Sequence, residues 1–267
     1  MKHRIVVCGT GTEIGKTHVA CALVAHLAAA GKTVVGLKPI ESGVGPSSAS
    51  AAVPPRADVT SAAADARTTN DPSATTPTAL PSQAPACSEV MTDSLVLARA
   101  SGKVDPGACY AFRDPVSPHL AARREGRSIE LETIAAWVGA RDADWQIVET
   151  AGGLLSPLST DLTNLDLALA LEPTAVVLCA PDRLGVLHDV AAALLALNLA
   201  NLADRTVVAL SAPPLGDDST GSNAAELETL GRAERPAAFP RAASHAAESE
   251  QAAAFLAARL LEVEQLG

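Results

Sequence analysis

Residues 9–17 read Gly-Thr-Gly-Thr-Glu-Ile-Gly-Lys-Thr and follow directly on the apolar run Ile-Val-Val-Cys of residues 5–8. A glycine-rich turn between a buried strand and a helix points several backbone N–H groups at one anion, and the helix macrodipole adds to the attraction. Lys16 is expected to reach the terminal phosphates of a nucleotide, and Thr17 carries the hydroxyl that binds Mg²⁺ in such loops. This stretch therefore predicts a magnesium nucleotide site at the start of an α/β fold.

The spacing of the glycines departs from the usual G-x-x-x-x-G-K-[ST] pattern. Gly9 stands six residues before Gly15 and Gly11 four, so Thr10 occupies the place of the first glycine. The alternative is an ordinary glycine turn into a helix. That alternative requires neither Lys-Thr after Gly15 nor a β-rich run before Gly9, so the context of strand, loop and helix favours the nucleotide site.

Composition and charge narrow the class of protein. The 267 residues are 48% hydrophobic, and we expect a single P-loop α/β domain over residues 1–267. The net charge of −10 repels nucleic acid and anionic membrane surfaces, so neither is expected as a partner. Five cysteines at positions 8, 21, 87, 109 and 179 lack Cys-x-x-Cys spacing, which is typical of a cytoplasmic protein. No apolar run reaches the ~20 residues of a membrane span.

Apolar β-rich segments alternate with Ala/Leu-rich segments of helical period. This alternation predicts a P-loop NTPase-like α/β fold, a mostly parallel sheet covered by helices on both faces. Ligands of such sheets bind at the carboxyl ends of the strands. The expected strands are Arg4–Cys8, Thr33–Leu37, Trp145–Glu149, Thr174–Ala180 and Arg205–Ser211. The expected helices are Lys16–Ala30, Ile129–Arg141, Leu184–Leu202, Ser222–Arg232 and Glu248–Val263.

Residues 44–86 break this alternation, since Ala, Ser, Thr and Pro dominate there. Such a composition buries too little apolar surface to offset the entropy of ordering, which predicts a disordered insertion. An active-site lid is the alternative, favoured only by the position of the segment between two motif-bearing stretches.

Three charged side chains are candidates for the chemistry. Pro39 biases Lys38 toward an extended backbone, so Lys38 is expected to project toward the phosphate loop, where a second ammonium stabilises a transferring phosphoryl group. Glu149 ends an apolar strand shortly before a glycine pair, and a carboxylate there suits Mg²⁺. Asp93 precedes an apolar helical run, which by itself indicates a helix cap. The alternatives are a lysine and an acid that merely face solvent.

Further motifs complete an ordered set along the chain. They are Lys38-Pro39 with Ser42-Gly43, Thr92-Asp93, Pro115-Val116-Ser117-Pro118-His119, and Glu149 with Ala151-Gly152-Gly153. Together with the loop 9–17, this set resembles the dethiobiotin synthase family. The resemblance covers most of the chain outside the insertion, strongly to about Asp161, and the ordered combination is more specific than any one motif.

The resemblance implies an enzyme of biotin biosynthesis that joins CO₂ to 7,8-diaminononanoate with hydrolysis of ATP and closes a cyclic urea. It implies that a carbamate of the diamine attacks the γ-phosphate and that the second amine then displaces phosphate. Mg²⁺ is the implied cofactor, ATP the co-substrate, and a homodimer the implied assembly.

The same resemblance implies roles for individual residues. Lys16 and Lys38 are the implied catalytic residues, because they neutralise the developing phosphoryl charge. The implied metal ligands are Thr17, Asp93 and Glu149. The implied nucleotide-binding residues are Glu13, Ile14, Gly15, Lys16, Thr17, His18, Asp93, Glu149, Gly152, Ser211 and Pro240. The implied substrate-binding residues are Thr12 and Ser42, which hold the carbamate, and Ser117 and His119, which line the diamine pocket and otherwise indicate a proline-rigid surface loop.

The chain departs from the family pattern at four places. Gly11 replaces an aspartate, Thr150 replaces a glycine beside the glycine pair, and residues 182–185 match only loosely. The largest departure is Ser211-Ala212, where the family places an asparagine that reads the adenine edge. Neither side chain reproduces the donor and acceptor of an amide, so either the backbone around Pro240 reads the base or base selectivity is poor. We expect weak nucleotide preference.

Rival functions share parts of this pattern. A partition-type ATPase has the same Gly-Lys-Thr turn, but its signature lysine falls where this chain has Gly11. A cobyrinate-type amidotransferase needs a further glutaminase domain that this length leaves no room for. A catalytically inactive nucleotide-binding interaction protein is favoured by Thr150 and by the missing adenine reader, and is opposed by Lys16, Lys38 and the three candidate metal ligands.

Overall fold

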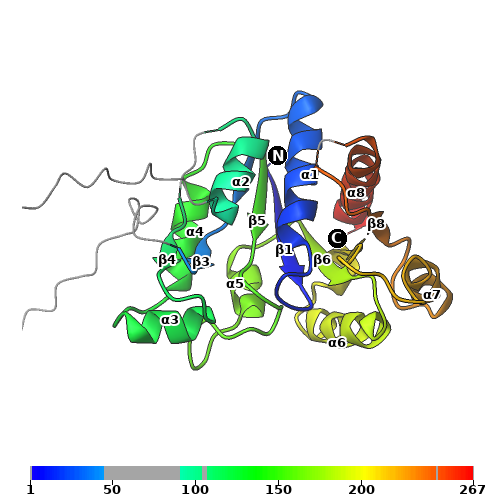
Figure 1. Ribbon diagram of the computed structural model, residues 1–267. Coiled ribbons are helices and arrows are strands. Elements are labelled where there is room, and N and C mark those ends of the chain that lie inside the picture. The colour runs from blue at the N-terminus through cyan, green and yellow to red at the C-terminus, as the bar shows by residue number, and fades with distance from the viewer. Residues whose placement is uncertain (1, 45–90, 104–106, 245, 267) are drawn as a thin grey trace, which may run out of the picture. The chain divides into compact units, whose positions relative to one another are not determined.

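The computed structural model describes residues 2–44, 91–103, 107–244 and 246–266 (Figure 1). Within these ranges, six strands form one parallel sheet in the order β2-β5-β1-β6-β7-β8, and two more strands form a separate parallel pair, β3-β4. The strands are β1 (His3–Gly9), β2 (Val34–Leu37), β3 (Ile40–Ser42), β4 (Tyr110–Phe112), β5 (Trp145–Glu149), β6 (Ala175–Pro181), β7 (Thr206–Ser211) and β8 (Ala237–Phe239).

Helices connect the strands and cover both faces of the larger sheet (Figure 1). They are α1 (Lys16–Ala29), α2 (Asp93–Ala100), α3 (Pro118–Arg124), α4 (Leu131–Gly139), α5 (Asn164–Ala170), α6 (Val186–Leu199), the 3-10 turn η1 (Ala203–Arg205), α7 (Asn223–Thr229) and α8 (Ala247–Leu266). Among the described residues, no helix combines the length and apolar character needed to cross a bilayer.

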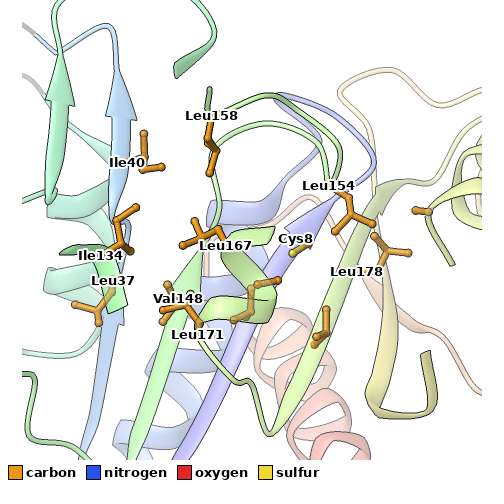
Figure 2. Packing of buried hydrophobic residues seen from close by; sticks show 14 of the residues in the cluster. Cys8, Leu37, Ile40, Ile134, Val148, Leu154, Leu158, Leu167, Leu171 and Leu178 are labelled. Carbon is orange, nitrogen blue, oxygen red and sulfur yellow. The ribbon is translucent and has the colours of Figure 1, made fainter. Parts of the chain in front are cut away.

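The inner parts of the sheet strands are mostly apolar because both faces of the sheet are buried, although β5 also carries the buried Gln146 and Glu149. In β1, Ile5 and Val7 contact the core that includes residues of α1 and α8, whereas Val6 and Cys8 contact the core that includes residues of α4 to α7. Figure 2 shows the second of these cores, with Cys8 among leucine, isoleucine and valine side chains. This two-sided burial explains why the sequence shows continuous apolar runs instead of alternation.

The predicted fold class is confirmed, but several boundaries were wrong. α6 is shorter than the predicted Leu184–Leu202, because Gly185 and Asn201 adopt positive φ angles of 95° and 57° at its two ends. α7 stops at Thr229 instead of continuing to 232, since Gly231 also has a positive φ. β3, β4 and β8 were not predicted. Each has three residues, too few to show a period.

The predicted insertion, residues 44–86, lies outside the described residues except at its first position. Val44 is buried, and its N–H donates a hydrogen bond to Phe112 O at 3.0 Å just beyond the end of β3. Val44 is thus placed by a contact with β4, and the insertion over the remaining residues stays a prediction.

Candidate active site

The phosphate loop joins β1 to α1 at the carboxyl edge of the sheet. Gly15 has a φ of +93°, and a side chain there would collide with the Ser211 hydroxyl, so the turn requires glycine. Glu13 has a φ of +57°, which is a strained conformation for a residue with a side chain. Strain of this kind often occurs where a backbone is shaped to bind a ligand.

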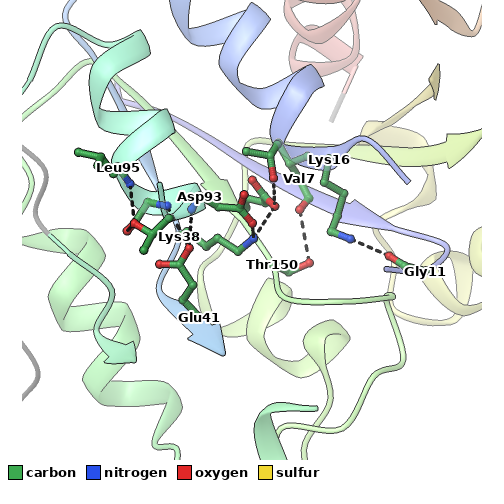
Figure 3. Close-up of polar contacts among 12 residues, drawn as sticks. Val7, Gly11, Lys16, Lys38, Glu41, Asp93, Leu95 and Thr150 are labelled. Atoms are coloured by element: carbon green, nitrogen blue, oxygen red, sulfur yellow. Dashed lines mark hydrogen bonds and ion pairs between the residues drawn. The ribbon is translucent and has the colours of Figure 1, made fainter. Parts of the chain in front are cut away.

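Lys16 turns back along this loop. Its ammonium donates a hydrogen bond to Gly11 O at 2.6 Å (Figure 3), and the residue is 5% exposed. Burial lowers the pKa of Lys16. Within the described part of the chain, Gly11 O is the hydrogen-bond acceptor of this buried cation. An arriving anion would compensate the desolvation that lowers the pKa of Lys16.

Lys38 lies at the centre of an ion cluster at the same edge. Its ammonium donates hydrogen bonds to Asp93 Oδ2 and, at 3.0 Å, to Glu149 Oε1. Thr17 donates its hydroxyl to the same Glu149 oxygen at 2.9 Å. Burial alone lowers the pKa of Lys38, but the carboxylates of Glu149 and Asp93 outweigh it, so the pKa lies above its usual value. Segments far apart in the sequence thus meet around one ammonium (Figure 3).

The sequence alone indicated Asp93 as the cap of α2. In the structure the cap is Thr92. The Thr92 hydroxyl accepts a hydrogen bond from Leu95 N–H at 3.3 Å, and Asp93 is the first residue of the helix. Its side chain is consequently free to contact Lys38.

The predicted metal ligands also fit Mg²⁺ by their chemistry. Glu149 is 1% exposed, and within the described part of the chain its Oε2 has no hydrogen-bond partner. An unpaired buried carboxylate oxygen is costly and calls for a further cation. The Thr17 hydroxyl and the Asp93 carboxylate supply other oxygen ligands close to it. Among the described residues no three acidic, histidine or cysteine side chains gather as ligands. Mg²⁺ takes few carboxylates and completes its shell with water and phosphate oxygens.

A cavity of about 690 Å³ opens beside the loop and the ion cluster. It brings together twelve of the residues predicted for the site: Thr12, Glu13, Ile14, Gly15, Lys16, Thr17, Lys38, Ser42, Asp93, Ser117, Glu149 and Gly152. Its size is within the range of small-molecule sites.

Four predicted residues do not line this cavity. His119 lies beside it, within 3.0 Å of the Ser117 hydroxyl through its Nδ1. Ser211 is buried against Gly15 on the other side of the loop. His18 contacts Pro240 O through Nε2 at 3.0 Å, and burial lowers its pKa. His18 and Pro240 thus contact each other outside the cavity lining, and Ser211 pairs with Phe239, the residue before Pro240.

Thr150 does not disturb the glycine pair, contrary to the concern raised by the family pattern. The residue is fully buried, its N–H donates to Val7 O at 3.0 Å, and its hydroxyl lies 3.4 Å from the same oxygen. The side chain therefore faces β1 and leaves the cavity unchanged.

Two polar residues of the site were missed. Glu41 lines the cavity and accepts hydrogen bonds from the start of α2. Asn164, fully buried, donates to Ala151 O at 2.6 Å and Gly153 O at 2.9 Å, and so fixes the glycine loop. The sequence offered one sign of Glu41, a carboxylate that directly follows the apolar Ile40 near the end of a predicted strand. Nothing in the sequence marked Asn164.

Known proteins resemble this chain over most of its length. A family model described as an AAA domain matches residues 81–249. The ATP-dependent dethiobiotin synthetase BioD of Caulobacter sp. (strain K31) is 34% identical over 79% of this chain and 78% of that protein. The protein of the same name from Anaeromyxobacter dehalogenans (strain 2CP-C) is 34% identical over 88% of this chain and 89% of that protein. Among solved structures, a ParA family ATPase from Chlorobium tepidum TLS has a TM-score of 0.45 at 12% identity, over 99% of this chain and 97% of that chain.

Proposed function

The chain belongs to the family of ATP-dependent dethiobiotin synthetases, and on that premise we propose how its own residues carry the reaction. It is a ligase of biotin biosynthesis that joins CO₂ to 7,8-diaminononanoate and closes the ring with hydrolysis of ATP. The observation that carries the proposal is the position of Lys38 and its two carboxylates at the wall of the cavity, next to the phosphate loop.

The triphosphate binds over the loop, where main-chain N–H groups and the start of α1 attract anions. Lys16 exchanges its hydrogen bond to Gly11 O for phosphate oxygens. Because burial disfavours its charge without an anion, this exchange is favourable and holds the γ-phosphate in place.

Lys38 leaves at least one carboxylate to reach the transferring phosphoryl group. The carboxylates of Glu149 and Asp93 raise the pKa of Lys38 in its resting position, so the side chain carries an ammonium charge when it turns toward the phosphoryl group. That charge stabilises the negative charge that develops as the phosphoryl group moves.

Thr17, Asp93 and Glu149 would hold Mg²⁺, and Glu149 Oε2 would gain the partner that it lacks. A bound Mg²⁺ supplies charge neutralisation for the phosphate oxygens.

The carbamate of the diamine lies on the cavity side of the loop, where Thr12 and Ser42 hold its oxygens and Ser117 and His119 border the chain of the substrate. One carbamate oxygen forms a bond to the γ-phosphorus and ADP leaves. The second amine then attacks the carbonyl carbon, the C–O bond to the phosphoryl group breaks, and phosphate departs with that oxygen while the amine loses its proton.

This route fixes the fate of the bicarbonate oxygens. In a rapid assay with [¹⁸O]bicarbonate and no carbonic anhydrase, we expect one ¹⁸O in the released phosphate and one in the urea carbonyl, both read by mass spectrometry. Unlabelled phosphate accompanying labelled dethiobiotin would show that the carbamate oxygen does not attack phosphorus, and would refute this sequence of steps.

Base selectivity should be weak, because position 211 offers no amide and its side chain packs against Gly15 instead of an open slot. We expect kcat/KM for ATP to exceed the values for GTP and CTP by less than about 100-fold, or ~2.7 kcal/mol. Competition assays with the three magnesium nucleotides measure this ratio. A larger preference would mean that other groups read the base.

Assembly and compartment complete the proposal. A homodimer is supported by the exposed leucines on and beside α6, Leu184, Leu195 and Leu199, since a partner subunit would cover apolar side chains of this kind. A reducing cytoplasm is supported by the four described cysteines, all of them buried free thiols.

A further inference from the structure

Glu41 is a buried carboxylate at the active site that the reaction as described does not use. It lies in β3, three residues after Lys38 and directly before Ser42, and is 6% exposed. Its Oε1 accepts hydrogen bonds from two main-chain donors, Asp93 N–H at 2.6 Å and Ser94 N–H at 3.3 Å (Figure 3). Both donors belong to the first turn of α2.

The first N–H groups of a helix have no partner within the helix and need an acceptor from outside. In α2, the Thr92 hydroxyl accepts the N–H of Leu95, and the Thr92 main-chain oxygen accepts the N–H of Val96. Glu41 satisfies the two preceding N–H groups, and a charged acceptor there is also favoured by the helix dipole. The start of α2 is thereby tied to the strand that follows Lys38.

This tie determines where the Asp93 carboxylate lies. Asp93 presents its N–H to Glu41 and its carboxylate to Lys38, so one residue is held at both its main chain and its side chain. The rest of α2 packs closely on β2, where a side chain at Gly36 would come within 3.1 Å of Leu97. The helix body is therefore held by packing, whereas its first residue is held by hydrogen bonds to Glu41 and Lys38.

We propose that Glu41 is a positioning residue, which holds the first turn of α2 so that Asp93 faces the metal and phosphate site. The proposal rests on the proposed function, in which Asp93 is a metal ligand. Partners that orient a ligand without touching the metal commonly affect its affinity by about 10- to 100-fold. This positioning role requires an acceptor oxygen within hydrogen-bond distance of the Asp93 and Ser94 N–H groups, and a negative charge alone does not supply it.

Two substitutions at position 41 separate the length of the side chain from its charge. Glu41→Gln keeps an acceptor oxygen at the same distance and removes the charge, whereas Glu41→Asp keeps the charge but is one methylene too short. Asp166→Ala is the matched control, because Asp166 accepts from Thr163 N–H and Oγ1–H at 2.7 Å in the capping box of α5, away from the cavity. Binding of Mn²⁺ to each ADP-saturated protein is measured from the electron paramagnetic resonance signal of free Mn²⁺, after circular dichroism has confirmed folding.

We expect Glu41→Asp to weaken Mn²⁺ binding by about 10-fold, and Glu41→Gln and Asp166→Ala to stay within about 3-fold of the wild type. Equal Mn²⁺ affinities for Glu41→Asp and Asp166→Ala would overturn the proposal. A 10-fold loss of Mn²⁺ affinity in Glu41→Gln would also overturn it, and this second measurement tests the proposal even if Glu41→Asp does not fold. Because the readout is metal binding, it stands apart from turnover. A wild type that binds Mn²⁺ with ADP yet forms no dethiobiotin would refute the proposed function and leave the role of Glu41 intact.

Discussion

Lys38→Met is expected to lower kcat by about 10³-fold. Methionine keeps the apolar stem of the side chain and removes only the ammonium, which is proposed to act on charge that appears in the transition state. The loss should therefore fall on kcat more than on the KM for ATP, and steady-state release of phosphate and of dethiobiotin measures both.

The same substitution has a cost in stability that the sequence did not indicate. Without the ammonium, Glu149 is a buried carboxylate with the Thr17 hydroxyl as its only described partner. Since Asp93 is partly exposed, we expect a loss of about 2–3 kcal/mol of unfolding free energy without metal, and recovery when Mg²⁺ and ADP are added.

The stability lost in Lys38→Met is expected to depend on pH. The pKa of Lys38 is higher in the folded protein than its ordinary 10.5, so its contribution is complete below pH 10.5 and declines as the pH rises further. The difference between wild type and variant should be constant from pH 7 to 10 and shrink above. Lys32→Met, at an exposed lysine, is the control. Near-normal kcat in Lys38→Met would contradict its catalytic role.

Lys16→Met should also lower kcat/KM by about 10³-fold, but with the opposite effect on stability. Lys16 acts on both bound and reacting phosphate, so the KM for ATP is expected to rise together with the fall in kcat. Calorimetric titration with magnesium ADP separates the loss of binding from the loss of turnover.

The stability of Lys16→Met is expected to match or exceed that of the wild type near pH 7. The pKa of Lys16 is lowered on folding, so the buried charge opposes folding at every pH below the folded pKa, and that opposition disappears above pH 10.5. Thermal unfolding of the two methionine variants side by side checks the contrast. A large destabilisation of Lys16→Met would mean that its bond to Gly11 O supports the fold, and not only a resting position.

Much of the site could be predicted because it depends on local order along the chain. The loop 9–17 and the acid that ends β5 are each read from a strand followed by a polar or glycine-rich turn, and parallel strands bring such turns to one edge. The convergence of Lys38 and Glu149 follows from that topology, because β2 and β5 are parallel neighbours in the sheet, whereas Asp93 reaches them from the start of α2.

What could not be predicted depends on contacts between distant segments. The Thr150 side chain could have faced the cavity or β1. Its direction depended on how the chain leaves β5 beside Val7. The hydrogen bond between Glu41 and Asp93 forms only when the start of α2 lies against β3. The short strands β3, β4 and β8 are defined by their pairing with other strands and not by a periodic sequence pattern. Long-range pairing of this kind overrides local propensity.

The central claim is that the purified chain makes dethiobiotin, and mass spectrometry tests it after incubation with 7,8-diaminononanoate, bicarbonate, Mg²⁺ and ATP. We expect product with wild type and with Lys32→Met, and only trace product with Lys38→Met. The absence of product from wild type, with the diamine and the nucleotide both shown to bind, would contradict the account.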